Sequence, residues 1–378
     1  MKKVGIFGGS FNPIHKGHIE VAKYAMKNLK LEEVWFIPTN ITPGKKRTNI
    51  ISNQQRLQII KESVKDIKAF KVKNYEIDNH NISYTIDTLN LLRKNYKNNE
   101  YYLLIGDDQF NKFLSWKDYQ EIIKKSHVVV FNREGIKNKE LIDKINPILL
   151  KNRKIDISST KIRQGHFNLL DENTLNIINK QYLYIDSVAK NNLTDYRLEH
   201  TYEVAKLIKQ FAIGNFSLWE KMKYKFNKKF LDKYYYTGML HDITKDKDKK
   251  WHLNILKKYN YDSDIHDNLL HQVTGYLWSK EVYKIQDEIS NAILYHTTAN
   301  DRMKKIDMLL YIADKIAGEK NEERKHWIKN IALVNYKLAF KEILKNNYDY
   351  IRGKFGISGV DQNTINAYKK YIGDRYEK

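Results

Sequence analysis

The sequence of 378 residues contains no cysteine, which excludes disulfide bonds, thiolate metal sites and cysteine nucleophiles. Proline is scarce, with 4 residues in all. No apolar run approaches the ~20 residues that a membrane-spanning helix needs. The N-terminal segment MKKVGIFGGS reaches its glycines too early for a secretory signal peptide. We therefore expect a cytoplasmic protein without a membrane partner.

Acidic residues are in short supply: 45 Asp and Glu stand against 67 Lys and Arg, which gives a formal net charge of +22. The excess is spread over both halves, without a basic tail or block. We interpret it as a compositional bias that also favours Asn, Ile and Tyr, and expect no specific nucleic-acid partner. A positive field would still attract nucleotide substrates. Non-specific nucleic-acid binding with a steep salt dependence is the alternative.

The first half of the chain alternates short apolar runs with helical periodicity. Strands are expected at 3–8, 34–37, 101–105, 128–131 and 155–157, and helices at 18–29, 53–66 and 83–97. This alternation predicts an α/β domain, a doubly wound, mostly parallel sheet with helices on both faces.

The second half shows helical periodicity alone, at about 196–213, 231–242, 269–281, 287–297, 305–317 and 326–346. Residues 186–195 are polar and have no period, so we expect a linker there. The chain is also too long for one ordinary core. We therefore predict two domains, 1–187 and 195–378, of which the second is an all-α helical bundle.

The segment from Gly8 to His18 joins the first expected strand to the first expected helix. In open parallel sheets, ligands bind beyond the carboxyl ends of the strands. The glycines would let backbone N–H groups approach a phosphate, and the helix N-terminus adds a favourable dipole. His15 and His18 are three residues apart and can both reach one polyphosphate. The spacing is neither that of a Walker A loop nor that of GxGxxG.

A second segment, Ile157-Ser158-Ser159-Thr160-Lys161-Ile162-Arg163, follows an expected strand and opens a helix. Its hydroxyls can cap that helix and contact phosphate, and Arg163 can reach the outer phosphates. Together the two segments resemble the (H/T)xGH and ISSTxIR signatures of the nucleotidylyltransferase superfamily, with Asn12 where the family commonly has aspartate. The resemblance implies a Rossmann-like nucleotidylyltransferase domain.

Other stretches resemble bacterial nicotinate-nucleotide adenylyltransferases: Val34–Pro38, Ser83–Leu89, Ile105–Asp108 and Trp116. In that family the SYTxDTL segment and the tryptophan after IGxD shape the mononucleotide pocket. An indole offers a flat face to a pyridine ring. By analogy, Thr85 would bond the nicotinate carboxylate. Lys45 falls near the family's PPHK lysine, although Gly44 replaces the histidine before it.

The resemblance implies that the phosphate of nicotinate mononucleotide attacks the α-phosphorus of ATP in line, giving deamido-NAD and pyrophosphate. The protein would position both substrates and stabilise negative charge, with Mg²⁺ bound to ATP. The expected catalytic donors are His15, His18, Lys45 and Arg163. The expected substrate-binding residues are Gly8, Gly9, Ser10, Phe11, Thr85, Gly106, Asp108, Trp116, Ser158, Ser159 and Thr160. The sequence leaves nicotinamide mononucleotide and pantetheine phosphate open as alternative acceptors.

Histidines and aspartates recur on apolar helical stretches of the second half. Ligands on separate helices that point inward are how helical bundles hold metals, and an adjacent His-Asp pair can serve two bridged ions. The pair His266-Asp267 lies in a polar stretch and is left out. The expected metal ligands are His200, His241, Asp242, His271, His296 and Asp314.

The stretches around these residues, LEHT, LHDITK, YHTT and YIAD, resemble the YqeK-type branch of the HD-domain phosphohydrolases over residues 195–345. That resemblance implies symmetrical hydrolysis of diadenosine tetraphosphate to two ADP at a two-metal centre, with iron as the expected metal. By analogy, one ion is held by His200, His241, Asp242 and Asp314, and the second by His271, His296 and the shared Asp242. Lys245 would contact phosphate and take part in catalysis.

Two stretches depart from that family. Residues 299–301 come between the HTT motif and Arg302, and residues 316–320 read IAGEK where the family has IEPxR. The exact substrate of the second domain therefore stays open. Its alternatives are another nucleotide phosphohydrolase and a non-catalytic sensor or docking module. The oligomeric state, including a homo-oligomer, and any coupling of the domains are also open.

Overall fold

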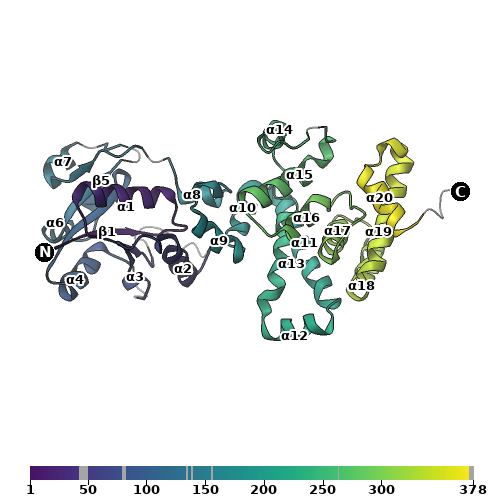
Figure 1. Cartoon of the computed structure of the whole chain (residues 1–378), viewed down its shortest axis with the longest axis horizontal. Helices are drawn as coiled ribbons and strands as arrows, with labels where there is room; N and C mark the ends of the chain where they lie inside the picture. Colours follow the sequence, from purple (N-terminus) through teal and green to yellow (C-terminus); the bar gives the residue numbers. More distant parts are fainter. Residues whose placement is uncertain are drawn as a thin grey trace. The chain divides into compact units, whose positions relative to one another are not determined.

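The computed structural model describes residues 1–41, 50–78, 82–132, 135–137, 139–154, 156–262 and 264–373. The chain divides into two compact units, Met1–Gln181 and Tyr182–Lys378 (Figure 1). Every helix in the described ranges is too short or too polar to traverse a lipid bilayer.

The first unit is built on a six-stranded parallel sheet with the strand order β3-β2-β1-β4-β5-β6. The central strands β1 and β4 pair from Lys2 opposite Asn99 to Ile6 opposite Leu103. The chain moves outward from β1 to β3, returns to β4 and moves outward again, so the carboxyl ends of β1 and β4 form a topological switch point. The strands are β1 Lys2–Gly9, β2 Glu33–Pro38, β3 Phe70–Val72, β4 Asn99–Gly106, β5 His127–Phe131 and β6 Ile148–Leu150.

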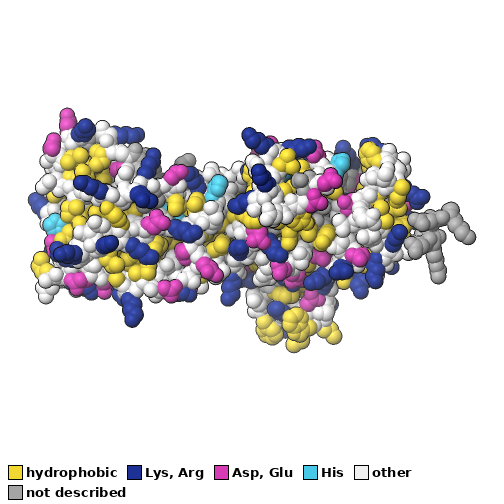
Figure 2. Space-filling model, turned by 45° about the horizontal axis from the view of Figure 1, so that its top comes forward, with side chains coloured by type: hydrophobic (Ala, Val, Ile, Leu, Met, Phe, Trp, Pro, Cys, Tyr) yellow, Lys and Arg dark blue, Asp and Glu magenta, His cyan; other side chains and the backbone are white. Residues whose placement is uncertain are grey.

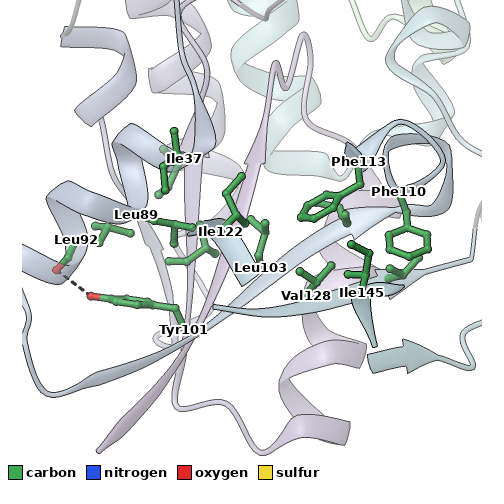
Figure 3. Packing of buried hydrophobic residues seen from close by; sticks show 14 of the residues in the cluster. Ile37, Leu89, Leu92, Tyr101, Leu103, Phe110, Phe113, Ile122, Val128 and Ile145 are labelled. Atoms are coloured by element: carbon green, nitrogen blue, oxygen red, sulfur yellow. Dashed lines mark hydrogen bonds between the residues drawn. The ribbon is translucent and has the colours of Figure 1, made fainter. Parts of the chain in front are cut away.

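Helices connect the strands and cover the sheet. They are α1 Lys16–Leu29, α2 Asn53–Val64, α3 Tyr75–Asp78, α4 Thr85–Asn95, α5 Asp107–Phe110, α6 Tyr119–Lys125, α7 Glu140–Ile145, α8 Ser159–Arg163 and α9 Glu172–Lys180, with 3-10 turns η1 Phe113–Ser115 and η2 Phe167–Leu169. On one face, alternate strand residues such as Leu103 and Val128 pack against Leu89, Phe110 and other helix residues (Figure 3). This period-two alternation is what a strand buried on that face requires.

The short outer strands differ from the prediction. The sequence predicted a strand at 155–157, but Asp156 and Ile157 lie in no strand, and Ile155 lies outside the described residues. The sixth strand is instead β6, which pairs with β5 from Val129 opposite Ile148. Strand β3 was not predicted.

The second unit is entirely helical in its described residues. Its elements are α10 Ile185–Asn192, α11 Asp195–Gly214, α12 Leu218–Phe226, η3 Lys228–Leu231, α13 Asp232–Leu240, α14 Lys249–Lys258, η4 Asp267–Leu269, α15 Leu270–Leu277, the π-turn η5 Trp278–Val282, α16 Asp287–Tyr295, α17 Lys305–Ala317, α18 Glu322–Val334, α19 Tyr336–Phe355, η6 Ile357–Gly359 and α20 Gln362–Tyr371. Helix α17 is the centre: residues 306–313 are all buried, and it packs against α11, α16 and α19. The predicted fold class, a doubly wound parallel sheet followed by a helical bundle, is confirmed.

Two expectations for this unit were wrong. The supposed linker at 186–195 contains helix α10, whose Ile185, Val188 and Ala189 are buried. The single helix expected at 326–346 is two helices, because Asn335 interrupts the run and its side chain accepts the backbone N–H of Leu338 to cap α19.

Helices α11 and α13 approach one another unusually closely. A Cβ atom on Gly238 would lie 2.5 Å from the Cα atom of Ala205, which is less than carbon atoms tolerate. Only glycine fits at position 238 without moving one of these helices.

Candidate functional site

In the first unit, His15 ends the loop between β1 and α1, and His18 lies in the first turn of α1. His15 caps α1, and its backbone N–H donates to Nδ1 of His18 at 3.2 Å. The two rings stack with their centroids 3.6 Å apart. The ring of Phe11 packs edge-on against His18 and also against Phe7. The structure thus brings together the predicted donors of this loop and fixes their rings.

The glycines at the end of β1 differ in their surroundings. A Cβ atom on Gly8 would meet nothing within 4 Å, so the backbone there is open to a ligand. On Gly9, a Cβ atom would come within 3.3 Å of the Phe11 ring. Ser10 follows, and its carbonyl accepts a hydrogen bond from an arginine that the sequence did not single out.

That arginine is Arg56 on α2, which is 5% exposed. Its guanidinium donates to the carbonyls of Ser10 and Thr39 at 2.5 and 2.6 Å, and to Oδ1 of Asn53 at 2.7 Å. It therefore ties the loop after β1 to the loop after β2. A buried arginine is rarely tolerated unless its donors are satisfied, but nothing in the sequence around position 56 gives its partners.

The second motif meets the first across about 150 positions of sequence. Ser159 donates to the carbonyl of Pro13 at 2.8 Å, and Arg163 donates to the carbonyl of Asn12 at 2.6 Å. Arg163 also donates to Oγ1 of Thr160 at 3.0 Å, while Ser158 caps α8. The phosphate-loop residues and the ISSTxIR residues therefore form one site at the carboxyl edge of β1.

The end of β4 contributes Gly106, which caps the short helix α5. Asp107 is buried, and its Oδ2 accepts the backbone N–H of Gly135 at 2.7 Å, so it supports the loop after β5. Asp108 is half-buried beside it, and its Oδ2 is 3.4 Å from Gln109 Nε2. Of the two adjacent aspartates, Asp108 was predicted to bind substrate, and the support role of Asp107 was missed.

The predicted mononucleotide residues lie on two neighbouring segments. Thr85 is the first residue of α4, and Trp116 follows η1 and packs against Phe113. Lys117 joins these segments, since its Nζ is 3.3 Å from Asp87 on α4 and 4.8 Å from the ring centre of Tyr84. The predicted Lys45 and Gly44 lie outside the described residues.

In the second unit, all six predicted metal ligands converge. They form two groups, and within each group the ligand atoms lie within 4.8 Å of one another. One group is His200, His241 and Asp314, and the other is Asp242, His271 and His296. Asp242 faces both groups. Its Oδ1 is 3.4 Å from His271 Nε2 and 3.5 Å from His296 Nε2, and its Oδ2 is 3.6 Å from His241 Nε2. A carboxylate placed in this way can bridge two ions.

Two of the histidines are oriented by backbone carbonyls. His241 Nδ1 donates to the carbonyl of Gly238 at 2.7 Å, and His296 Nδ1 donates to that of Ile293, also at 2.7 Å. A proton held on Nδ1 leaves the lone pair on Nε2, which faces the centre in both residues. Metal-binding histidines typically have such support.

The ionisation of the cluster also suits metal binding. Burial lowers the pKa of His271 well below its usual value, assisted by the neighbouring His296, and burial likewise lowers the pKa of His296. For Asp242 and Asp314, burial acts to raise the pKa, but the neighbouring histidines, and for Asp314 also Lys315, outweigh it and hold both well below the usual range. The same two carboxylates raise the pKa of His241 against the effect of its burial, so a bound cation would have to displace a proton there. Neutral imidazoles and ionised carboxylates are the forms that bind metal. The donor set therefore fits a pair of cations.

A pocket opens over this cluster, and three cations are among its lining residues. Lys245 Nζ lies 2.9 Å from His271 Nε2. Lys315 Nζ lies 2.9 Å from Asp314 Oδ2, and Arg197 Nη1 lies 3.7 Å from Asp242 Oδ2. Lys245 was predicted, whereas Arg197 and Lys315 were missed. The sequence does offer a signal, because Arg197 precedes His200 by three residues on one helix and so shares its face.

The His-Asp pair that the prediction left out lies away from this pocket. His266 and Asp267 are exposed, and Asp267 pairs with Lys249 at 2.8 Å. Thr297 of the HTT motif lines the pocket, but Arg302 is exposed and is absent from its described lining. Gly318, in the stretch that departs from IEPxR, lies at the pocket.

Comparisons with known proteins follow the same division. The cytidylyltransferase-like family model matches residues 6–165, and the HD domain model matches residues 197–319. A protein of Mycoplasma genitalium, named "Probable nicotinate-nucleotide adenylyltransferase/Ap4A hydrolase", is 31% identical over 354 residues, which cover 92% of this chain and 96% of that protein. A namesake from Mycoplasma pneumoniae is 28% identical over 89% of this chain and 95% of its own length. A "Probable nicotinate-nucleotide adenylyltransferase" of Clostridium perfringens is 39% identical over 49% of this chain and 98% of its own length.

Proposed function

The chain belongs to the family of nicotinate-nucleotide adenylyltransferase/Ap4A hydrolases, and on this premise we propose that it catalyses both reactions. The first unit transfers the adenylyl group of ATP to nicotinate mononucleotide, which yields deamido-NAD and pyrophosphate. The second unit hydrolyses diadenosine tetraphosphate, abbreviated Ap4A, to two ADP. Both act on adenosine polyphosphates, and we propose a cytoplasmic location.

One observation carries the first activity: Arg163 and Ser159 are hydrogen-bonded to the backbone of the loop that holds His15 and His18. A single polyphosphate at the end of β1 would meet donors from both segments. In this reaction the acceptor phosphate attacks directly, so no side chain becomes a nucleophile. The donors hold ATP in line and stabilise the charge that passes to pyrophosphate. Mg²⁺ would arrive with ATP.

The acceptor would be selected by residues of two other segments. Trp116 offers a flat face to the pyridine ring, and Thr85 at the start of α4 offers a hydroxyl and a helix N-terminus to the carboxylate. The exposed Lys117–Asp87 ion pair spans the two segments. These contacts favour nicotinate over nicotinamide, because a helix N-terminus prefers an anion.

The second activity depends on Asp242, whose two oxygens face the two ligand groups. His200, His241 and Asp314 would hold one ion, His271 and His296 the other, and Asp242 would be shared. Two ions in such a site activate water and neutralise phosphate. Arg197, Lys245 and Lys315 would bind the polyphosphate chain. The mixed imidazole and carboxylate donors suit iron, which we propose as the resident metal.

The test uses the full chain, purified with its metal counted, and follows both reactions by product analysis. His18→Ala should suppress formation of deamido-NAD and leave ADP release from Ap4A intact. Asp242→Ala should do the reverse. In each variant, the reaction that is retained shows that the unchanged unit is still folded.

Several results would contradict the proposal. Transfer to pantetheine phosphate in preference to nicotinate mononucleotide would reject the acceptor. Metal-loaded protein that hydrolyses neither Ap4A nor related nucleotides would make the second unit a sensor or docking module. Unchanged hydrolysis in the Asp242→Ala variant would reject the shared-carboxylate site.

A further inference from the structure

Helix α12 in the second unit has its apolar side chains in solvent. None of its nine residues is buried. The exposed fractions are 83% for Leu218, 64% for Trp219, 62% for Met222 and 81% for Phe226. Figure 2 shows apolar side chains gathered on the projection that α12 forms, at the bottom of Figure 1. Large apolar patches of this kind usually mark an interaction surface.

These four side chains share one face of the helix. At 3.6 residues per turn, positions 218, 219, 222 and 226 fall within a sector of roughly 100°. The opposite side is anchored to the unit: Glu220 pairs with Lys305 at 2.8 Å, and Tyr224 packs against Phe216. The helix is therefore fixed with its apolar face outward, the reverse of an ordinary surface helix.

Lysines surround the apolar face. Lys221 and Lys225 lie on one flank and Lys223 on the other, and all three are exposed. Lys228 and Lys229 follow in η3 but do not border this face: Lys228 Nζ lies 4.2 Å from the ring centre of Tyr224, on the anchored side, and Lys229 interacts electrostatically with Asp232. Glu220 is the single acidic residue between positions 218 and 231, and it is turned inward to Lys305. The face thus combines protruding apolar side chains with the positive charge of three flanking lysines.

We propose that α12 docks this enzyme on an anionic lipid surface, with Leu218, Trp219, Met222 and Phe226 in the headgroup boundary and the lysines at lipid phosphates. Helices that lie in a membrane interface combine Trp, Phe and Leu on one face with lysines around it. This binding is independent of both reactions. It departs from the expectation of no membrane partner. It needs no spanning segment, because the helix would lie on the bilayer, and none of the described helices is long and apolar enough to cross one.

A second copy of the chain is the less suitable occupant. A symmetric pairing of two α12 faces would bring the three flanking lysines of one copy close to those of the other, and the segment has no exposed acidic residue to compensate them. An anionic bilayer supplies the opposite charge and accepts apolar side chains without needing a matching groove. Charge complementarity therefore favours lipid.

The experiment measures co-sedimentation of the full chain with vesicles. Phosphatidylcholine vesicles containing phosphatidylglycerol should bind the protein, and pure phosphatidylcholine vesicles should bind it at least about tenfold more weakly, because each lysine near an anionic surface strengthens binding. The Trp219→Ser/Phe226→Ser variant should lose binding, whereas Trp327→Ser, which changes an exposed tryptophan on α18, should retain it. Both enzyme activities, measured without vesicles, report that each variant is folded.

Charge is tested separately. Lys221→Gln/Lys225→Gln should weaken binding to the anionic vesicles on the order of tenfold, and Lys257→Gln/Lys258→Gln, an equal charge change on the exposed end of α14, should weaken it far less. Equal losses from both pairs, or equal binding to both vesicle types, would overturn the proposal. Absence of binding would also overturn it. Self-association that the Trp219→Ser/Phe226→Ser change abolishes, without vesicle binding, would assign the face to a second copy.

Discussion

The guanidinium of Arg163 donates a 2.6 Å hydrogen bond to the carbonyl of Asn12, the residue where the superfamily commonly has aspartate. An asparagine side chain carries no charge that could compete with the phosphates for the arginine. The contact uses the backbone, which every residue supplies. The departure at position 12 is therefore compatible with an intact phosphate site.

Replacement of Arg163 by alanine should reduce kcat/KM for deamido-NAD formation by about 10²–10³-fold, the usual effect of removing one preorganised donor. Ap4A hydrolysis by the same sample should be unchanged. Lys161→Ala is the matched control, because Lys161 lies on the same helix but pairs with Asp156 at the surface. A similar loss in both variants would argue against a specific role for Arg163.

Arg197 and Lys315 should matter for substrate affinity. Arg197→Ala or Lys315→Ala should raise the KM for Ap4A by roughly 10–100-fold, because a hydrogen bond to a charged group is worth ~1.5–3 kcal/mol. Metal content should stay at the wild-type value. Arg302→Ala, which changes an exposed arginine not found in the described pocket lining, should leave KM unchanged. Loss of metal in the Arg197 variant would mean that this residue acts on the metal centre instead.

The Asp242→Asn variant should bind metal more weakly than the wild type. The loss should exceed the ~10–100-fold that follows removal of a residue hydrogen-bonded to a ligand, because Asp242 itself is a ligand in both groups. A chelator should reproduce this effect in the wild type and lower the melting temperature of the second unit, because ions that bind only the folded state stabilise it. The control is Asp267→Asn, in the exposed His-Asp pair. Wild-type metal content in Asp242→Asn would contradict the bridging role.

Asp307 should make the stability of the second unit depend on pH. Burial raises its pKa to about 6, against the lowering effect of the Lys304 backbone N–H that it accepts. Below pH ~4 the carboxyl is protonated in the folded and unfolded states; above pH ~6 it is ionised in both, and burying the charge costs stability. Its contribution therefore falls by up to about 3 kcal/mol as the pH rises from about 4 to 6.

The Asp307→Asn variant should lack this dependence. Relative to the wild type, the variant should become more stable as the pH rises through that window, as measured by amide hydrogen exchange of α17. A constant difference between wild type and variant from pH 4 to 7 would show that Asp307 does not titrate in this range.

The sequence predicted the long central elements well and the short outer ones poorly. Strands β1 and β4 are buried on both faces and so have continuous apolar runs. Strand β3 has three residues, too few to show a period. Residues 148–150 (ILL) and 155–157 (IDI) are equally short candidates for the last strand. Helix α10 escaped notice because its buried stripe consists of Ile185, Val188 and Ala189 among polar residues.

The candidate sites divide in the same way. Histidines and aspartates on apolar helices are unusual enough to be singled out, and their order predicted one cluster, which the structure contains. Lysine is frequent in this chain, so Lys315 could not be told from a surface cation until the helices were placed, whereas the spacing of Arg197 from His200 did give a signal. Arg56 was hidden for another reason, because two of its partners are backbone carbonyls that any sequence provides.

The close approach of α11 to α13 at Gly238 sets a limit on how this chain can vary. The missing side chain lets His200 on one helix and the His241–Asp242 pair after the other reach the same point, and the Gly238 carbonyl orients His241. Libraries selected for Ap4A hydrolysis should therefore retain glycine at position 238 almost without exception. Libraries selected only for deamido-NAD synthesis should accept other residues at position 238. The two selections would therefore tolerate different substitutions in the second unit.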